Sequence, residues 1–474
     1  MKITVVTSEE NPLKKVAAAA RTCYSTTPVL PIGLGKTKEE LIAFCKALFD
    51  AGHLTCFMHV NYTFLIEDVS RKFVWDVLHR TTFYNSEQVS QRYTYTELKG
   101  NVFLPSFLGT SPETAGQIES LYVSVDEAYK KIADALVESG LDMKATQENA
   151  RYILPVSCFT SLYYTVNLVT VVKIWRLCLH KGDSESLAFS NVLKDSILML
   201  DDSLSFLFVQ PEENTQYIPK TKELLRLEMQ KSHPAQLVSC RFPADFMVET
   251  EALKDTVAGI RAFIQEEKPN GLDYGVNDYS NFLRRVFVVF QNCLSFVSDC
   301  QEQRHRTILQ VRPSLEDTYS EGKRNFYIPP VIAENAYARS IFEKTVNSLY
   351  DCIDVLRSPC DGGDRMYVRN EWSYLLPNAH IYTIQEMGDL ESFSRKWMQR
   401  FCYNAQEETR LLNQCQYKEL ARYCNQWLSN NGKRILNCFG PPCEFARDGG
   451  QKCREGKRSC LARGNKAPWK HWKD

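Results

Sequence analysis

The stretch RHRTILQVRPS, from Arg304 to Ser314, places two arginines around one histidine and a serine eight positions after the second arginine. Successive side chains of an extended segment point to opposite sides, so Arg304 and Arg306 would face one side and His305 the other. Two guanidinium groups could then hold an anionic ligand through charge-assisted hydrogen bonds, while the imidazole contacts a second group. The alternative is a basic surface turn whose arginines pair with nearby carboxylates.

The composition is that of a globular protein without a global charge. The chain has 474 residues, of which 44% are hydrophobic, and its 57 basic residues balance 57 acidic ones. This length allows one large core or two to three domains. Because the charges cancel, no overall field draws the chain to nucleic acid, and a nucleic-acid partner is not expected.

The cysteines and the opening residues favour a cytoplasmic protein. The 17 cysteines are an odd number, and the start, MKITVVTSEE, lacks the basic residues and apolar run of a signal peptide. Reduced thiols, most of them buried as small apolar groups, fit best. The uncharged run from Tyr152 to Val172 has the length of a membrane span, but it contains Pro155, Asn167 and several hydroxyl side chains. We expect a buried helix or strand there and no membrane contact.

Three segments recur in the same order in the two halves of the chain. In the first half SEQVSQRY (86–93) is followed by VFLPSF (102–107) and ENARYILP (148–155); in the second half RHRTILQVRPS is followed by FYIPPVI (326–332) and NEWSYLLP (370–377). Ser90 and Pro155 are 65 residues apart, and Ser314 and Pro377 are 63 apart. This repetition predicts two diverged copies of one domain, residues 1–240 and 241–474.

Local patterns predict an α+β fold. KITVVT (2–7) and NYTFLIEDV (61–69) have the β-branched and aromatic content of strands. KEELIAFCKALFDAG (38–52) is amphipathic and ends at a glycine, which is typical of a helix. The apolar spacing of residues 115–140 and 390–415 also predicts helices.

Arg304, His305 and Arg306, followed after seven residues by Ser314, resemble the signature of the flavin-dependent thymidylate synthases (thymidylate synthase complementing proteins). Further segments are similar to that family in their usual order: VAAAARTCYS (16–25), GHLTCFMHVNYTFLIEDVSR (52–71), SQRY (90–93), ENARYILP (148–155), NAQEETR (404–410) and the cysteine-bearing end GPPCEFARDGGQKCREGKRSC (440–460). The resemblance implies a tandem duplication in which each copy is a mainly antiparallel sheet with helices.

The resemblance also implies the activity, the reductive methylation of dUMP to dTMP. In this family reduced FAD delivers the hydride, methylenetetrahydrofolate gives the carbon and NADPH reloads the flavin, so the protein supplies binding, alignment and electrostatics. The competing thymidylate chemistry uses a Cys in a Pro-Cys-His setting, and none of the 17 cysteines stands in one. Two alternatives remain: a flavin- and folate-dependent enzyme acting on another uracil nucleotide, and a non-catalytic nucleotide-binding relative.

The two copies depart from the family pattern in opposite ways. The first has His79, Arg80 and Thr81 where the family has Arg-His-Arg. It keeps the residues of the nucleotide loop and the arginine that reaches a nucleotide in a neighbouring subunit, namely Glu87, Gln88, Ser90, Gln91, Arg92, Tyr93 and Arg151. The second copy keeps the signature but has Glu316 and Ser373 at the places of the loop arginine and the reaching arginine.

Three sets of site residues follow from the resemblance. The catalytic set is Arg304, Ser314 and Arg400. The cofactor-binding set is Arg304, His305, Arg306, Asn404, Thr55 and Ser280. The substrate-binding set is Gln301, Arg304, Ser314, Arg400, Arg151, Glu87, Ser90, Gln91 and Arg92. Met58 and Leu283 stand where the family has a flavin-contacting Glu, and Arg312 could replace the charge of the lost loop arginine.

The family's quaternary structure suggests how the copies are used. Its members are homotetramers whose active sites cross subunit boundaries. A fused pair that associates as a homodimer would rebuild a pseudo-tetramer with two kinds of site. We expect the site centred on the second copy to work, with Arg151 supplied by a first copy.

The C-terminal residues do not predict a metal site. Cys438, Cys443, Cys453 and Cys460 are separated by four, nine and six residues, which is irregular for zinc, and no metal is expected. The basic tail from residue 452 includes two tryptophans. We interpret it as solvated or as closing over folate glutamates, in preference to a polyanion contact.

Overall fold

The computed structural model describes residues 1–81, 83–95, 97–105, 112–210, 234–266, 278–320, 322–357 and 371–440. The chain forms two compact units. Unit 1 comprises Met1–Ile218 and Pro330–Asn378, and unit 2 comprises Pro219–Pro329 and Ala379–Asp474. Each unit has one four-stranded sheet and its own hydrophobic core.

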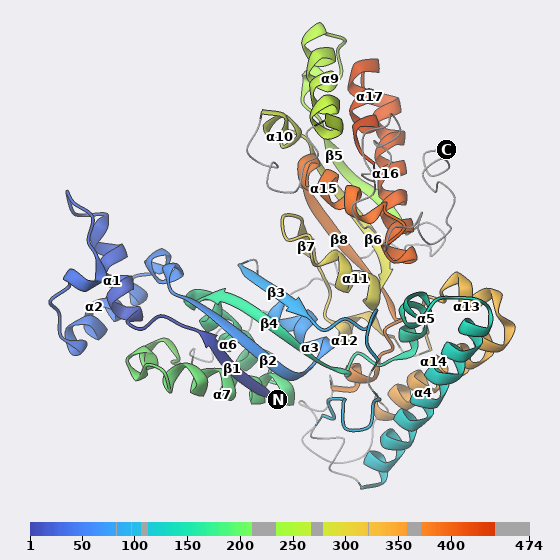
Figure 1. Ribbon diagram of the computed structural model, residues 1–474, viewed down its shortest axis with the longest axis horizontal. Helices are drawn as coiled ribbons and strands as arrows, with labels where there is room; N and C mark the ends of the chain where they lie inside the picture. The colour runs from blue at the N-terminus through green and yellow to red at the C-terminus, as the bar shows by residue number, and fades with distance from the viewer. Residues whose placement is uncertain are drawn as a thin grey trace. The chain divides into compact units, whose positions relative to one another are not determined.

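The sheet of unit 1 has the strand order β1-β2-β4-β3, and its neighbouring strands are antiparallel (Figure 1). The strands are β1 (Lys2–Thr7), β2 (Asn61–Ser70), β3 (Tyr84–Gln88) and β4 (Phe159–Asn167). In β2 the alternate residues Tyr62, Phe64 and Ile66 are buried in the core. A period of two is typical of a sheet with one face on a core. The strands predicted at residues 2–7 and 61–69 are confirmed.

The sheet of unit 2 repeats this topology with the strand order β5-β6-β8-β7, again antiparallel. Its strands are β5 (Ala235–Arg241), β6 (Phe287–Ser295), β7 (Leu309–Val311) and β8 (Ile381–Asp389). In both sheets the last strand in the chain pairs between the second and the third. The predicted α+β fold with two diverged copies is therefore confirmed.

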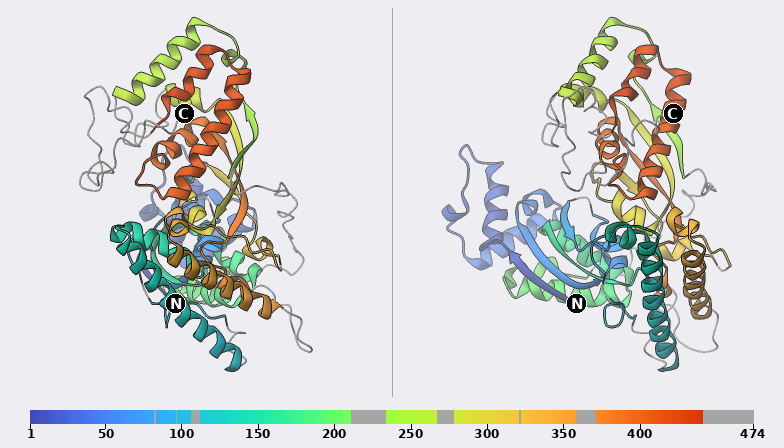
Figure 2. Two further views of the ribbon diagram at one scale, coloured as in Figure 1. Left: turned by 90° about the vertical axis from the view of Figure 1, so that its right-hand side faces the viewer. Right: turned by 45° about the vertical axis from the view of Figure 1, so that its right-hand side comes forward.

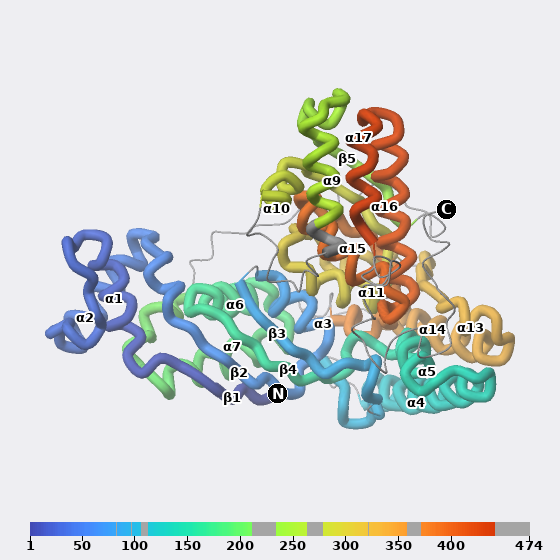
Figure 3. The backbone as a smooth tube through the Cα atoms, turned by 45° about the horizontal axis from the view of Figure 1, so that its top comes forward, coloured from blue at the N-terminus to red at the C-terminus, as the bar shows by residue number. Residues whose placement is uncertain are grey.

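Helices pack against both sheets. The helices of unit 1 are α1 (Pro12–Thr22), α2 (Lys38–Asp50), α3 (Arg71–Phe73), α4 (Pro112–Glu138), α5 (Met143–Ala150), α6 (Leu168–Lys181), α7 (Ser184–Leu198), α13 (Pro330–Glu334) and α14 (Ala336–Arg357), with short helical turns η1 (Pro31–Gly33), η2 (Leu54–His59), η3 (Val74–Leu78), η5 (Arg151–Ile153), η6 (Asp202–Leu207) and η8 (Glu371–Leu375). Those of unit 2 are α9 (Glu251–Glu266), α10 (Asp278–Leu283), α11 (Phe296–Glu302), α12 (Leu315–Thr318), α15 (Leu390–Arg400), α16 (Glu407–Trp427) and α17 (Asn430–Arg434), with turns η7 (Ala244–Phe246) and η9 (Ile435–Cys438). Helices α6 and α7 lie together beside the sheet of unit 1 (Figure 3).

Most of the predicted elements are present, with one correction. Helix α2 starts in a capping box between Thr37 and Glu40, and Gly52 follows it at φ 78°. The run from Tyr152 to Val172 is mostly buried, as predicted, although Tyr163 is exposed, and it divides into η5, β4 and the start of α6. The single helix predicted over residues 390–415 is wrong, because the chain turns at residues 401–406 between α15 and α16. The apolar spacing continues through this turn, so periodicity alone could not reveal it.

A serine–glutamate pair joins a strand end to a following helix in each copy. In unit 1 the backbone nitrogen and the hydroxyl of Ser70 each donate to Glu185, both at 2.6 Å. In unit 2 Ser295 donates to Glu408 in the same way, at 2.7 and 2.6 Å. The two serines also cap the helices that follow β2 and β6. The same four-atom arrangement in both units is further evidence of duplication.

A segment of the second copy belongs to unit 1. Helix α14 packs against α4 of the first copy (Figure 2). Beyond α14, the Tyr374 hydroxyl donates to Asp183 at 3.1 Å, and Glu371 accepts from the backbone of Ser184 at 2.6 Å. The compact units therefore do not coincide with the sequence copies, and the predicted boundary near residue 240 falls inside β5.

The structure gives two further findings about the described part of the chain. Its cysteines are all free thiols. None of its helices has both the length and the apolar content that crossing a membrane requires.

Glu185 should make the stability of the fold depend on pH. It is fully buried, and burial raises its pKa to about 7 from an ordinary 4.5, although the bonds from Ser70 lower it. Between these values the folded chain keeps a proton that the unfolded chain has released, so the free energy of unfolding falls as the pH rises. Glutamine cannot ionise. We therefore expect Glu185→Gln to abolish this pH-dependent loss of unfolding free energy, which is about 1–3 kcal/mol between pH 4.5 and 7 in the wild type.

The measurement is the urea midpoint, followed by tryptophan fluorescence, at several values between pH 4.5 and 7.5. Glu127→Gln, at an exposed position on α4, is the matched control and should keep the wild-type slope. Parallel curves for wild type and Glu185→Gln would contradict the raised pKa.

Candidate active site

The signature arginines lie in a tight turn at the end of α11. The backbone nitrogen of Arg304 donates to Gln301 at 3.3 Å, and that of His305 donates to Glu302 at 3.1 Å. The segment is a turn and not extended, because α11 closes before β7 begins. The turn still separates the side chains: Arg304 and Arg306 are exposed, whereas His305 is half-buried.

The surroundings of His305 favour its neutral form. Burial, together with the positive charges of Arg400, Lys396 and Arg304, holds its pKa well below the ordinary 6.5. Its Nε2 is buried and has no hydrogen-bond partner among the described protein atoms. The turn therefore offers two exposed cations and one neutral ring nitrogen.

Arg400 joins this turn from the end of α15. Its Nη2 donates to the backbone oxygen of Gln301 at 2.7 Å, and its Nε lies 3.7 Å from Oε1 of Glu302. The side chain of Gln301 donates to Gln406 in the turn before α16. Gln301, Arg304, His305 and Arg400 are thus gathered at one end of α11.

Ser314 and Arg312 are engaged elsewhere. Ser314 lies at the start of α12, and its hydroxyl donates to Asp317 at 2.8 Å. Arg312 forms a fork with the buried carboxylate of Asp299, with N–O distances of 2.8–3.0 Å. The interpretation of Arg312 as a replacement charge is weakened, because its guanidinium already pairs with Asp299.

Two residues that follow β3 in unit 1, Gln91 and Arg92, are linked to the region of Arg151. Arg92 forms an ion pair with Glu148 at 2.9 Å, and Arg151 follows three residues later, where α5 ends. The amide of Asn378 donates to the Gln91 side chain at 3.1 Å and to the Arg151 backbone at 3.0 Å. Asn378 belongs to the second copy, and sequence reasoning missed it because no motif marks it.

The first copy's broken signature is held by a different charge pattern. Asp76 is fully buried and pairs with Arg80 at 2.9 Å, with Lys72 at 3.7 Å and with Lys181. Burial opposes ionisation of Asp76, but these three cations outweigh it and lower its pKa. Arg80 is thereby tied to a structural carboxylate.

The remaining predicted residues lie on several other elements of the two units. Thr55 is exposed in η2 of unit 1, and Glu87 and Ser90 lie at the end of β3 or just after it. In unit 2 Asn404 is half-buried before α16. Ser280 is buried in α10, with 2% of its surface exposed, so its hydroxyl is not presented to a ligand here.

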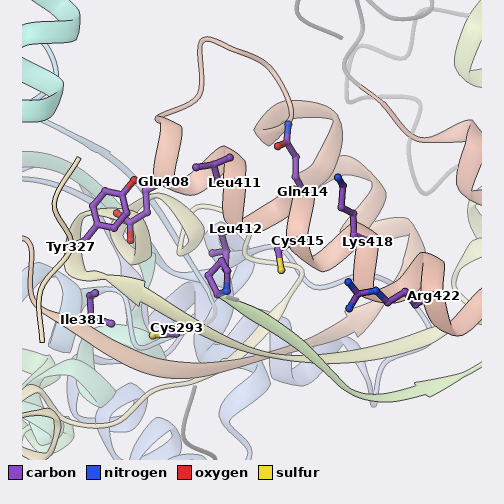
Figure 4. Close-up of a pocket in the computed structure, with 11 residues that line it drawn as sticks. Cys293, Tyr327, Ile381, Glu408, Leu411, Leu412, Gln414, Cys415, Lys418 and Arg422 are labelled. Atoms are coloured by element: carbon purple, nitrogen blue, oxygen red, sulfur yellow. The ribbon is translucent and has the colours of Figure 1, made fainter. Parts of the chain in front are cut away.

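Unit 2 also contains a cavity of about 400 Å³ between α16 and the sheet (Figure 4). Tyr327 and Glu408 lie at one end of it and Lys418 and Arg422 at the other, with leucine side chains between them. None of the predicted site residues lines this cavity.

No metal centre is formed by the described residues, since His, Cys, Asp and Glu do not gather there in groups of three. Cys438 is buried in η9. Cys443, Cys453, Cys460 and the basic tail from residue 452 lie outside the described residues.

The family model of the thymidylate synthase complementing proteins matches residues 4–186 and 277–424. A flavin-dependent thymidylate synthase of Clostridium tetani is 30% identical over 185 residues, which cover 37% of this chain and 73% of that relative. One of Geobacter sulfurreducens is 28% identical over 181 residues, with the same coverage. The crystal structure of flavin-dependent thymidylate synthase ThyX from Helicobacter pylori with FAD and dUMP aligns at 22% identity and a TM-score of 0.31, over 44% of this chain and 98% of that one.

The two matched segments fall in different halves of the chain and together cover more than half of it. They agree with the repeated strand order of the two sheets. The chain therefore belongs to the thymidylate synthase complementing protein family, the family of the flavin-dependent thymidylate synthases, and carries it as a diverged tandem duplication.

Proposed function

We propose that this chain is an FAD-dependent thymidylate synthase that reductively methylates dUMP to dTMP with methylenetetrahydrofolate, and that NADPH reduces the flavin. The observation that carries the proposal is the cluster of Gln301, Arg304, His305 and Arg400 at the end of α11. It offers several cationic and hydrogen-bonding groups at one place and requires no thiolate.

Three of the described cysteines are unsuited to act as thiolates. Burial raises the pKa of Cys158 and of Cys240 to about 12 and also raises that of Cys56. A thiol with so high a pKa is protonated at neutral pH and is a poor nucleophile.

We infer one working site that combines residues of both copies. The second copy contributes Gln301, Arg304, Ser314 and Arg400, and the first contributes Glu87, Ser90, Gln91, Arg92 and Arg151. The inference rests on the division of residue types between the copies: each copy lacks what the other keeps. We further propose copies 1–240 and 241–474 and a homodimer that forms a pseudo-tetramer.

The Arg304 turn fits an anionic cofactor. Arg304 and Arg306 are exposed cations suited to the two phosphates of FAD, and His305 adds a neutral ring nitrogen. Asn404 and Thr55 would complete the set, whereas the buried Ser280 does not fit. When bound, reduced FAD supplies the hydride. Arg400 would then bind the nucleotide and stabilise the negative charge that develops on the uracil ring.

Glu316 favours a second candidate, the same chemistry on another uracil nucleotide. It stands on α12 where the family has the phosphate-binding loop arginine. A carboxylate disfavours a phosphate unless it is paired or turned away. A nucleotide that presents its phosphate differently would avoid this repulsion.

The proposed reaction can be tested directly. Purified protein is incubated with FAD, NADPH, methylenetetrahydrofolate and dUMP without oxygen, and dTMP is measured by liquid chromatography. We expect dTMP from dUMP and less product from UMP. Product from UMP alone would establish the second candidate, and neither product nor bound flavin would favour a non-catalytic nucleotide-binding relative.

Three arginine variants test the combined site. We expect Arg151→Ala and Arg400→Ala each to lower kcat/KM by roughly 10- to 100-fold, because each removes a charged hydrogen-bond donor. Arg80→Ala is the matched control and should be mild, because its partner Asp76 keeps Lys72 and Lys181. Loss of turnover in Arg80→Ala with full turnover in Arg151→Ala would show that another site works.

A further inference from the structure

A buried charge network lies beneath the Arg304 turn. The ammonium group of Lys396 on α15 contacts both Glu302 and Glu386, at 2.5 Å in the second case, and all three side chains are fully buried. Ionic groups in such a place cost free energy unless opposite charges and hydrogen bonds offset the loss of water. The network therefore requires an explanation.

Glu386 on β8 is the fully satisfied member. Besides Lys396 it accepts hydrogen bonds from Asn292, Gln310 and Gln416, each at 2.8 Å. Burial opposes its ionisation, but the charge of Lys396 and these bonds outweigh burial and lower its pKa. Glu386 is thus a fixed anion that anchors Lys396.

Glu302 is the less satisfied member, and it faces the site. It accepts from Asn413 at 3.2 Å. Burial and, less strongly, the charge of Glu386 raise its pKa, whereas the charges of Lys396 and Arg400 act in the opposite direction and favour the ionised carboxylate. Its backbone oxygen accepts from the nitrogen of His305, and its Oε1 lies 3.7 Å from Nε of Arg400. Glu302 therefore connects the buried network both to His305 in the Arg304 turn and to Arg400 at the end of α15.

The first copy shows that the fold does not require this network. Val77 follows Ser70 by seven residues, as Glu302 follows Ser295. Ile174 is six residues beyond the start of α6, as Lys396 is beyond the start of α15, and Tyr164 is the sixth residue of β4, as Glu386 is of β8. Valine, isoleucine and tyrosine thus fill the equivalent buried positions. The charges occur in the copy that keeps the Arg-His-Arg signature.

We propose that Glu302 is a positioning residue: held by Lys396 and Glu386, it fixes the guanidinium of Arg400 for binding an anionic nucleotide. The identity of that nucleotide rests on the function proposed above. Arg400 donates through Nη2 to Gln301, and the Glu302 carboxylate attracts its Nε across 3.7 Å, which is longer than a hydrogen bond, so the two contacts together favour one direction of the guanidinium plane. A displacement of about 1 Å at such a group can cost up to 100-fold in rate.

The test compares two variants that both lack the Glu302 carboxylate but differ in the charge balance of the buried network. It thereby distinguishes a role in positioning Arg400 from a role in stability. Wild type has two cations, Lys396 and Arg400, against two carboxylates, Glu302 and Glu386. Glu302→Gln leaves one excess positive charge, and the double variant Glu302→Gln with Lys396→Met restores the balance. The double variant should therefore recover thermal stability without returning the carboxylate that Arg400 needs.

Two readouts are taken on the full chain. Calorimetry measures binding of dUMP, and phenylglyoxal labelling with peptide mass spectrometry measures the accessibility of Arg400, with the exposed Arg304 as internal reference. We expect both Glu302→Gln and the double variant to bind dUMP roughly 10- to 100-fold more weakly and to label Arg400 faster. Glu391→Gln is the matched control: Glu391 is also buried on α15 but pairs with Arg395 at 2.5 Å, so binding and labelling should stay at the wild-type level.

Either of two results would overturn the proposal: unchanged labelling of Arg400 in Glu302→Gln, or recovery of dUMP binding together with stability in the double variant. If wild type binds no dUMP and forms no dTMP, the proposed function fails. The labelling of Arg400 still decides the positioning role in that case.

Discussion

The bonds from Ser295 to Glu408 fix where β6 ends and where α11 begins, and the site depends on that point. A carboxylate that receives both a backbone nitrogen and a hydroxyl at 2.6–2.7 Å leaves little freedom to the chain. Helix α11 starts directly after Ser295 and is seven residues long. Its start therefore sets the positions of Gln301 and Glu302 in its last turn. Glu408 belongs to α16. The position of the Arg304 turn is therefore fixed relative to β6, α11 and α16.

The equivalent pair, Ser70 and Glu185, shows that this joint is part of the fold and not of the chemistry. It is present in the copy whose signature is broken. The copies differ in the buried charged residues that follow this serine. These are Asp76 with Lys72 and Lys181 in the first copy and Glu302 with Lys396 in the second. The scaffold thus remained while its charged groups diverged.

The sequence predicts the scaffold well and the contacts between distant residues poorly. Strand alternation and the repeated segments predicted β1, β2 and the two copies, because these signals are local or simply periodic. The break after Arg400 was missed, since apolar spacing continues through it. Asn378, which connects Gln91 with Arg151, and the transfer of α14 to unit 1 depend on pairings across more than 200 residues. The place of Glu302 in the buried network could not be predicted, because nothing near it in the sequence reveals Lys396 or Glu386.

Duplication within one chain explains how such a network can persist. In an assembly of identical subunits, every substitution appears in every site, so a buried ion network is present wherever the subunit is. Such networks often stabilise a fold no better than apolar residues of similar size. In a fused pair the two copies change separately: the first fills these positions with Val77, Ile174 and Tyr164, while the second keeps the charges beside Arg400. The fusion therefore lets each copy carry its own buried charges: Asp76 with Lys72 and Lys181 in the first, and Glu302, Glu386 and Lys396 beside Arg400 in the second.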